Sequence, residues 1–454
     1  MKKTILLSAS LAMLLMVCAC SQKDKGAGQV VLATLDPGHF HAALVQKTSY
    51  PQVSQDVYVY SNPGNDLQEH LGRIEAYNTR DDNPTGWNEI VYTGDDFLEK
   101  MISDGKANVM VTAGNNLKKT EYIKETLAAG INVLADKPMA INPENFELLK
   151  RCFEIANHKG VLLYDIMTER HEITTILQRE LSLIPAIYGQ QEPGTPERPG
   201  ITMESVHHFY KEVSGKPNIR PAWFYDVDQQ GEGIVDVATH LVDLVQWQCF
   251  PDEILYPSDV KINSASHWVT PLTLAQFQAS TGLDEYPDFL MKDVHNGVLE
   301  VYQNGEINYE LRGLSAQVTV LWNYQAPEGG GDTHYCEMRG TKANVTIRQG
   351  AEQGWKPELY IEAKPAEGYA EALQASFAEL EKKYPGIKLE QLDDFEWHVF
   401  VPDSYRNGHE AHFGQVTENF LKYFEEGKLP DWEQPGMITK YYTTTEAYKM
   451  ARSK

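Results

Sequence analysis

The segment ANVMVTAGNNLKKTEYIKETLAAGINVLADKPMA, residues 107–140, contains two short apolar runs separated by an amphipathic stretch. The runs at 109–113 and 131–135 have the length and composition of buried strands. The stretch between them, 119–129, repeats its apolar residues at helical spacing. A strand, a helix and a second strand in this order predict two parallel strands joined by a crossover helix.

The same alternation extends to both sides of this segment, over residues 29–165. We expect further buried strands at 30–35, 57–60 and 161–164, and a helix at 143–156 that is capped by Asn142. After residue 166 the pattern changes, and 298–347 is rich in β-branched and aromatic residues broken by Asn-Gly and Gly-rich turns. The sequence therefore predicts an α/β protein. A doubly wound parallel sheet at 29–165 precedes a second domain, 166–454, with a large open, mostly antiparallel sheet.

The first residues predict export. Lys2 and Lys3 precede an apolar stretch, 5–17, that is too short to span a bilayer, and Val17-Cys18-Ala19-Cys20 follows. This pattern is typical of a bacterial lipoprotein signal over residues 1–20, with the lipid on Cys20. A secretory signal cleaved elsewhere is the alternative. Residues 21–28 are polar and suit a tether. We expect a protein anchored in the cell envelope, either periplasmic or on the outer surface.

Charge and cysteine content exclude several kinds of partner and site. The formal net charge is −24 at pH 7, and such a surface repels nucleic acid and anionic lipid. We therefore expect no nucleic-acid partner and no membrane contact beyond the lipid. Beyond the signal only Cys152, Cys249 and Cys336 remain, far apart and without metal-type spacing. We expect them to be small buried residues, with a single disulfide as the alternative.

Two motifs carry side chains suited to catalysis. Asp136-Lys137-Pro138 follows the expected strand at 131–135, at the edge where parallel sheets do their chemistry. Proline restricts the residue before it, so Lys137 is pinned, and a cis Lys-Pro bond is conceivable. In GEGIVDVATHLVD, residues 231–243, Asp236 and His240 are four apart and would share one helix face. A carboxylate beside an imidazole can hold its tautomer and raise its basicity.

Together these motifs resemble the glucose-fructose oxidoreductase and inositol dehydrogenase (Gfo/Idh/MocA) family. Residues 107–140 are similar to its fourth strand, helix and fifth strand, which end in a Glu/Asp-Lys-Pro signature. WFYDVDQQGEGIVDVATHLVDLVQW, 223–247, looks like its Trp-containing loop and Asp-x-x-x-His helix, and CEMRGTKANVTI, 336–347, like a late turn of its second sheet. The resemblance implies a Rossmann-like dinucleotide-binding domain, and a second domain whose sheet often packs on another subunit, hence a homo-oligomer.

The resemblance also implies an activity: NAD(P)-dependent oxidation or reduction of a sugar, glycoside or keto sugar. It places Lys137, Asp236 and His240 at the catalytic positions. His240 would take the hydroxyl proton, Asp236 would steady the imidazole, and Lys137 would stabilise charge on the reacting oxygen. The substrate side of the pocket would be lined by Glu169, Arg170, His171 and Tyr225.

The expected cofactor is NAD or NADP. Because no free pool of it exists outside the inner membrane, we expect it to be tightly bound. The turn Asp36-Pro37-Gly38-His39-Phe40-His41 stands where the family usually carries G-x-G-x-x-G, and it keeps only the middle glycine. The residues expected to contact the cofactor are Asp36, Gly38, His39, Phe40, His41, Ser61, Asn62, Ala113, Asn115, Asp136 and Lys137.

Three alternatives remain open on the sequence. One is a glycoside-cleaving enzyme of the same fold, in which transient oxidation allows the aglycone to leave by elimination. Another is a cofactor-free protein, either a sugar-binding lipoprotein or a keto-glycoside lyase. The third is a metal site formed by Asp36, His39 and His41. We expect no metal, and read these histidines as capping the first helix or contacting phosphate. His409 and His412 are expected at a helix start near the crevice.

Overall fold

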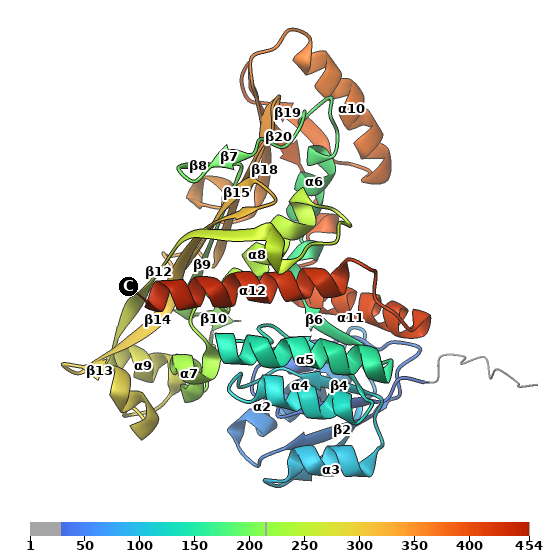
Figure 1. Ribbon diagram of the computed structural model, residues 1–454, viewed down its shortest axis with the longest axis vertical. Helices are drawn as coiled ribbons and strands as arrows, with labels where there is room; N and C mark the ends of the chain where they lie inside the picture. The colour runs from blue at the N-terminus through green and yellow to red at the C-terminus, as the bar shows by residue number, and fades with distance from the viewer. Residues whose placement is uncertain (1–28, 214–215, 454) are drawn as a thin grey trace, which may run out of the picture.

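The computed structural model describes residues 29–213 and 216–453. The predicted signal and tether, residues 1–28, lie outside this range. The described chain forms two sheets flanked by helices, with two C-terminal helices lying between them (Figure 1). Within the described residues no helix is long and apolar enough to cross a bilayer. Cys152, Cys249 and Cys336 are free thiols. Cys152 and Cys336 are buried, as expected, whereas Cys249 is half-buried.

The first domain is built on a parallel six-stranded sheet in the order β3-β2-β1-β4-β5-β6. The order reverses between β1 and β4, so a crevice opens at the carboxyl ends of these two strands. The strands are β1 Leu32–Leu35, β2 Asp56–Ser61, β3 Asn88–Thr93, β4 Val109–Thr112, β5 Asn132–Asp136 and β6 Leu163–Ile166. The helices are α1 His41–Leu44, α2 Asn65–Thr79, α3 Phe97–Asp104, α4 Lys119–Ala128 and α5 Pro143–Lys159.

This sheet confirms the predicted doubly wound architecture. The side chains of β1, β4 and β6 are all buried, which explains why these strands are continuous apolar runs in the sequence. The Asn142 side chain accepts a hydrogen bond from the Asn145 backbone N–H, as its expected capping role requires. Strand β3 had no sequence signal of this kind, because it lies at the sheet edge and none of its residues is buried.

The second domain contains a ten-stranded sheet in the order β12-β14-β15-β9-β16-β17-β18-β20-β19, with β13 paired to β14. All pairs are antiparallel except β15 with β9, so the predicted mostly antiparallel sheet is confirmed. Its strands are β9 Ile201–Tyr210, β12 Val260–Thr273, β13 Val294–His295, β14 Val298–Leu311, β15 Leu314–Gln325, β16 Thr333–Arg339, β17 Ala343–Arg348, β18 Glu358–Ala363, β19 Lys388–Gln391 and β20 Glu396–Phe400.

Helices and two small hairpins complete this domain. The α-helices are α6 Ile173–Ser182, α7 Val227–Gln230, α8 Ala238–Cys249, α9 Leu274–Thr281 and α10 Tyr369–Lys383. The short 3-10 helices are η1 Thr168–His171, η2 Ala222–Tyr225, η3 Pro257–Asp259, η4 Asp288–Asp293, η5 Ala351–Gln353 and η6 Asp403–Tyr405. The hairpins pair β7 Gly194–Thr195 with β8 Arg198–Pro199, and β10 Glu212–Val213 with β11 Lys216–Pro217.

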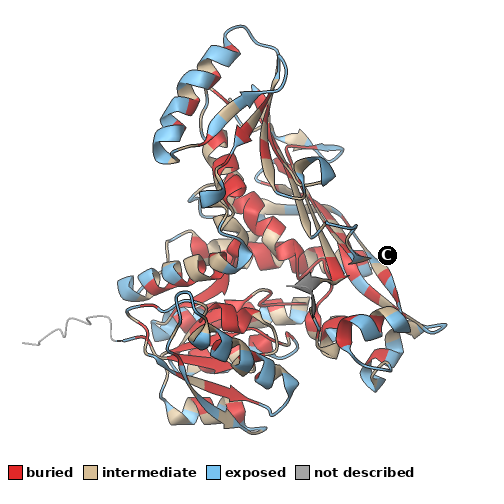
Figure 2. Cartoon of the chain, turned by 180° about the vertical axis from the view of Figure 1, so that it is seen from behind, coloured by how far each residue is buried: buried red, intermediate tan, exposed pale blue. Residues whose placement is uncertain are grey.

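The last two helices, α11 His409–Glu426 and α12 Glu433–Arg452, connect the domains. Helix α11 packs on α1, η1 and β6, and α12 contacts α5 of the first domain and α8 and β12 of the second. In Figure 1 α12 crosses the molecule between these elements, and Figure 2 shows buried residues on both sides of this junction. Apolar residues of α11 and α12, including Phe420 and Tyr441, belong to the core of the first domain.

An ion network whose members are buried or nearly buried lies at this junction. Lys440 of α12 places its Nζ 2.7 Å from an oxygen of Asp165 in β6 and 2.9 Å from an oxygen of Asp243 in α8. Arg170 donates two hydrogen bonds of 2.7 Å to Asp243 and a third of 2.9 Å to Glu433. One ammonium therefore joins a strand of the first domain to a helix of the second.

We expect Lys440→Met to destabilise the protein by about 3–5 kcal/mol, because it leaves the buried Asp165 carboxylate without its cation. Urea unfolding measured by circular dichroism tests this. Lys449→Met on the same helix is the matched control, because that side chain is 65% exposed. It should change stability by less than about 0.5 kcal/mol. Equal effects of the two changes would contradict a structural role for the network.

Candidate active site

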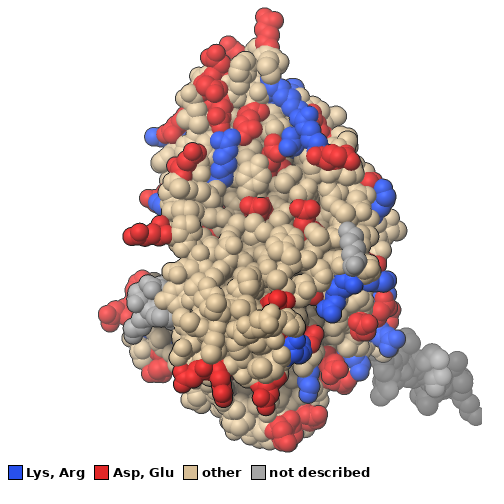
Figure 3. Space-filling view, turned by 90° about the vertical axis from the view of Figure 1, so that its left-hand side faces the viewer, with Lys and Arg blue, Asp and Glu red and all other residues tan. Residues whose placement is uncertain are grey.

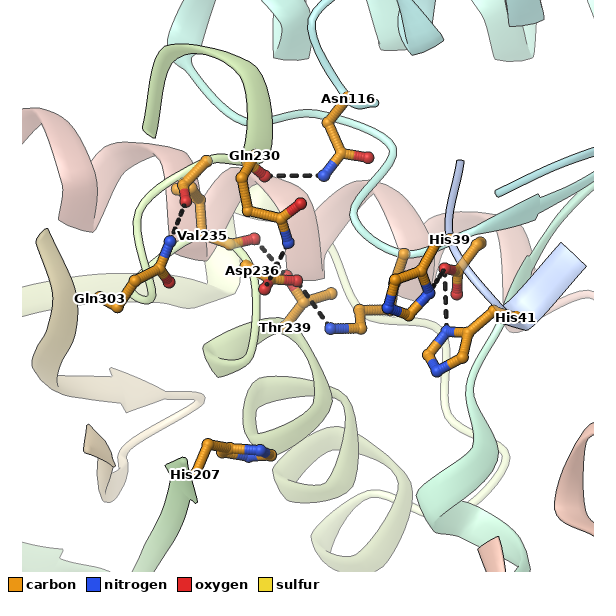
Figure 4. Close-up of polar contacts among 12 residues, drawn as sticks. His39, His41, Asn116, His207, Gln230, Val235, Asp236, Thr239 and Gln303 are labelled. Carbon is orange, nitrogen blue, oxygen red and sulfur yellow. Dashed lines mark hydrogen bonds and ion pairs between the residues drawn. The ribbon is translucent and has the colours of Figure 1, made fainter. Parts of the chain in front are cut away.

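Lys137 reaches from the first domain into the second. It follows Asp136, the last residue of β5, and the Lys137–Pro138 peptide bond is cis, as the sequence allowed. Its Nζ lies 2.6 Å from Oδ1 of Asp236, and the two side chains are only 11% and 3% exposed. The other Asp236 oxygen accepts a hydrogen bond from Gln230 at 3.0 Å (Figure 4). A cation at a strand end and a carboxylate before α8 thus form one pair across the domain boundary.

The loop before α8 is held close to the second sheet. A Cβ at Gly233 would come within 1.8 Å of the Gln303 carbonyl oxygen in β14, so only glycine fits there. Gln303 donates its side-chain amide to the Gly231 carbonyl at 2.9 Å. Helix α8 begins at Ala238, so Asp236 lies in the preceding turn rather than on the helix. These contacts fix the carboxylate that receives Lys137.

The expected Asp236–His240 pair is wrong in its details. Asp236 accepts from Lys137 and Gln230, while the buried Nδ1 of His240 has no hydrogen-bond partner among the described residues. Burial, reinforced by the Lys137 ammonium, lowers the pKa of His240 to about 3. The imidazole is therefore neutral at physiological pH and carries a free lone pair. Asp236 instead positions Lys137 next to that imidazole.

The turn after β1 closes onto β4. Asp36 adopts a left-handed conformation, with φ of 48°, where a Gly-rich turn would carry glycine. The backbone N–H groups of Gly38 and His39 both donate to the Ala113 carbonyl oxygen, at 3.2 and 3.1 Å. A Cβ at Gly114 would lie 2.4 Å from the Asp36 carbonyl oxygen, so this approach requires glycine. The N–H groups that would face a phosphate therefore donate to the residue that follows β4.

A cavity of about 480 Å³ adjoins this turn, between α2 of the first domain and η2 of the second. Gly38 and His39 line it, together with the cationic side chains Arg73 and Arg220. The Trp223 indole N–H donates to Asp66 at 2.9 Å across the same gap. The cavity thus joins the predicted cofactor-binding turn to the second domain.

Two imidazoles occupy the space between the β1 turn and β5. The Nδ1 atoms of His41 and His39 lie 3.0 and 3.6 Å from the same Asp136 oxygen (Figure 4). Burial alone would raise the pKa of Asp136, but the two imidazoles hold that pKa well below its usual range. Burial lowers the pKa of both histidines. The two histidines do not cap the first helix as predicted, because no side chain forms a capping hydrogen bond at the start of α1.

The remaining residues expected to contact the cofactor differ in their exposure and in their protein contacts. Asn115 donates to the Gln229 side chain at 2.6 Å, so the turn after β4 is bound to helix α7. Ser61, at the end of β2, is 3% exposed, whereas Asn62 is exposed. Phe40 is half-buried on the cavity wall. Their contact with a cofactor stays a prediction.

Only part of the expected substrate-side set faces the crevice. Glu169 pairs with Nδ1 of His409 at 3.3 Å, and its charge acts on the imidazoles of His240 and His334. Burial alone would raise the pKa of Glu169, but the contact with His409 holds it well below its usual range. Burial and the neighbouring His412 lower the pKa of His171 to about 4. As expected, His409 and His412 begin a helix beside this crevice.

Arg170 and Tyr225 were wrongly expected to bind substrate. The Arg170 guanidinium forms ion pairs with Asp243 and Glu433 in the junction network. Tyr225 is 1% exposed, and its hydroxyl donates to Ser280 at 2.6 Å within the second domain's core. Both side chains support the fold, because their polar groups already have protein partners.

Sequence reasoning missed Lys119 and His334. Lys119, on α4, is 1% exposed and donates to the Asp136 carbonyl at 3.1 Å, and burial lowers its pKa to about 8. Because α4 reads as an ordinary amphipathic helix, nothing marked this lysine as buried. His334 stands in β16, far from the other site residues in sequence, and its Nε2 is buried without a partner among the described residues.

We expect Lys137→Met to raise the pKa of His240, because the Lys137 ammonium is one of the causes that lower it. NMR titration of protein labelled on histidine Cε1 tests this. His398 is the internal control, because its pKa is raised by the hydrogen bond with Glu358, away from Lys137. An unchanged His240 titration in the folded variant would contradict the proximity of the two groups.

Comparison with known proteins supports an oxidoreductase fold. A family model described as "Oxidoreductase family, NAD-binding Rossmann fold" matches residues 52–165. A second, described as "Putative oxidoreductase C terminal domain", matches residues 177–452. The first match starts after the β1 turn, whose sequence departs from the glycine pattern. Among curated proteins none matches the chain.

Several solved structures share the whole architecture. A "putative oxidoreductase" from Parabacteroides merdae is 60% identical, with a TM-score of 0.93, covering 94% of this chain and 98% of its own. Levoglucosan dehydrogenase in complex with NADH is 14% identical, with a TM-score of 0.58 and coverages of 93% and 97%. KijD10, a 3-ketoreductase from Actinomadura kijaniata in complex with NADP and TDP-benzene, is 14% identical, with a TM-score of 0.55 and coverages of 92% and 97%. The last two show similarity of fold alone.

Proposed function

The chain belongs to the Gfo/Idh/MocA family of NAD-binding oxidoreductases, and on that premise we propose that it interconverts a hydroxyl and a keto group on a neutral saccharide or glycoside in the bacterial cell envelope. The observation that carries this proposal is the position of the Lys137–Asp236 ion pair beside the unpartnered, neutral imidazole of His240. A cation and a base that flank one space can stabilise and deprotonate the same substrate oxygen.

In the direction of oxidation, His240 takes the proton of the reacting hydroxyl. Lys137 donates a hydrogen bond to the same oxygen and stabilises the negative charge that develops on it. Asp236 holds the ammonium in place through its 2.6 Å contact. NAD or NADP bound in the cavity lined by Gly38, His39 and Arg73 would supply the hydride acceptor. In the direction of reduction, Lys137 polarises the carbonyl by donating a hydrogen bond to its oxygen.

The polar groups of the crevice favour a neutral, hydroxyl-rich substrate. His240, His334 and His412 each have a buried ring nitrogen without a partner among the described residues, and an imidazole offers one donor and one acceptor to sugar hydroxyls. Lys137 and Arg170 are already matched by carboxylates, so neither is free to bind an acidic sugar. The names of two similar folds, a 3-ketoreductase and a levoglucosan dehydrogenase, agree with this class.

We also propose that NAD or NADP is retained in the cavity beside the β1 turn. The fit rests on the cavity lining, where the backbone of Gly38 and the cation Arg73 adjoin the same space. The N–H groups of Gly38 and His39 would hold a phosphate by exchanging their bonds to Ala113. Tight retention suits a protein outside the inner membrane, where no free cofactor replaces what is lost.

A second candidate function is glycoside cleavage by elimination. A keto group acidifies the neighbouring C–H bond, and the ionised Glu169 could serve as an additional base, because its pKa is held low by His409. Removal of that proton would expel the aglycone and leave an enone. Addition of water to the enone and return of the hydride from the reduced cofactor to the keto carbon would then complete the cycle without net oxidation. The two functions share the formation of the keto group and differ in the steps after it.

The homo-oligomer expected from the family remains a proposal. Figure 3 shows a face of the molecule on which uncharged side chains cover a broad central area. Trp268 of β12 and Tyr302 of β14 are 39% and 36% exposed on the large sheet. A sheet face with few charges and exposed aromatic side chains is suited to contact with a second copy.

We expect His240→Gln and Lys137→Met each to lower turnover of neutral glycosides by about 10²- to 10⁴-fold, because each removes a group that acts on the reacting oxygen. Mass spectrometry of the products identifies a keto sugar for the oxidoreductase and a free aglycone for the elimination. His158→Gln, an exposed change on α5, is the control. Full activity in both folded variants would exclude this site.

We expect denaturation of the purified protein to release close to one equivalent of NAD or NADP per chain, detected by mass spectrometry. The reason is the retention that the envelope location requires. If no dinucleotide is released and none binds when added, the redox proposal is wrong and a cofactor-free protein remains. If dinucleotide is released, the amount retained by Asn62→Ala and Arg73→Ala is compared with that of wild type. Asn62 is among the residues expected to contact the cofactor, and Arg73 lines the cavity.

A further inference from the structure

We propose that His39, His41 and Asp136 form a binding site for one divalent transition-metal ion at the turn that follows β1. The sequence alone suggested a ligand set with Asp36, but β5 brings Asp136 to the two imidazoles instead. Such a site goes beyond the oxidoreductase chemistry proposed above and does not depend on it. The site departs from our expectation that the protein holds no metal.

The distances fit metal coordination. A tetrahedral ion with bonds of about 2.0–2.1 Å keeps its ligand atoms about 3.4 Å apart. Nδ1 of His41 and Nδ1 of His39 lie 3.0 and 3.6 Å from the same Asp136 oxygen, which bracket that value. All three ligand atoms lie within 4.8 Å of one another. An ion can therefore be placed among them with small side-chain adjustments.

Hydrogen bonding alone does not satisfy this cluster. At 3.6 Å the His39 Nδ1 is too far from the carboxylate for a good hydrogen bond, and this buried atom has no other partner among the described residues. The ring centroids lie 3.9 Å apart with an interplanar angle of 84°, and both Nδ1 atoms approach the same Asp136 oxygen. A shared ion would give the orphaned nitrogen a partner.

The surroundings hold the ligands in place. Lys119 donates to the backbone carbonyl of Asp136 at 3.1 Å, which fixes the end of β5. The His41 ring packs on Phe413 of α11 at a centroid distance of 4.5 Å. Ligands fixed in this way lose little freedom when an ion binds.

The donor set indicates which ion and what role. Two imidazoles and one carboxylate suit Zn²⁺ or Co²⁺ better than Mg²⁺, which prefers oxygen ligands alone. Three protein ligands leave a fourth position open, as in catalytic zinc sites. His39 also lines the 480 Å³ cavity, so an ion bound to its Nδ1 would lie beside that cavity. The fourth position would take an oxygen donor, either a phosphate oxygen of the dinucleotide or an oxygen of the saccharide.

Titration of the chelator-treated full-length protein with CoCl₂ tests the site, because Co²⁺ reports its coordination by visible absorption. We expect one equivalent to bind with a four- or five-coordinate spectrum, and ZnCl₂ to displace it. His39→Gln and His41→Gln should each weaken binding by roughly 100-fold or more. The control is His158→Gln with His295→Gln, which removes two exposed imidazoles. Circular dichroism shows whether each variant is folded.

Addition of pyrophosphate or of a neutral methyl glycoside to the Co²⁺ protein identifies the fourth ligand. A spectral change with pyrophosphate supports a phosphate contact, and one with the glycoside supports a substrate contact. If neither pyrophosphate nor the glycoside changes the spectrum, the ion has no open coordination position for these ligands. Absence of stoichiometric binding, or equal binding by wild type and the folded variants, overturns the site. Because binding is read without turnover, failure of the redox proposal would leave this result intact.

Discussion

The buried ammonium of Lys440 is the contact on which the arrangement of the domains depends. It lies between Asp165 of the first domain and Asp243 of the second, and Tyr441 adds a hydrogen bond to Asp165 at 3.0 Å. Charges in a protein interior are costly unless every one is matched, so the network is stable only in one geometry. The C-terminal helix that carries Lys440 therefore sets how the two sheets face each other.

That geometry determines the crevice. Lys137 leaves the parallel sheet at β5 and finds its carboxylate, Asp236, in the loop before α8. A shift of about 1 Å between the domains would break a 2.6 Å contact and leave two nearly buried charges unpaired. Arg170 depends on the same geometry, because it pairs with Asp243 and Glu433 at the junction. Its neighbour in sequence, Glu169, faces the crevice. The structural network and the reactive groups are thus neighbours along η1.

The parts that could be read from the sequence are those with a strong periodic or positional signal. Buried parallel strands are apolar runs, so β1, β4, β5 and β6 were recognisable, and the proline after Lys137 marked the end of β5. The edge strand β3 was not, because its exposed residues carry no such run. Lys119 and His334 were not recognisable as site residues either, since burial at a distant contact leaves no local pattern.

By itself the sequence determined the fold class, the order of the two domains, the family and the positions of Lys137, Asp236 and His240 along the chain. These follow from short-range patterns that one segment can carry. Only the tertiary structure decided the pairings: Asp236 binds Lys137 and not His240, Asp136 and not Asp36 meets the two imidazoles, and Tyr225 is core. The physical reason is that an ion pair or ligand set depends on distances across the sheets and domains. Those distances are set by packing and by the buried charges of the junction, not by spacing along the chain.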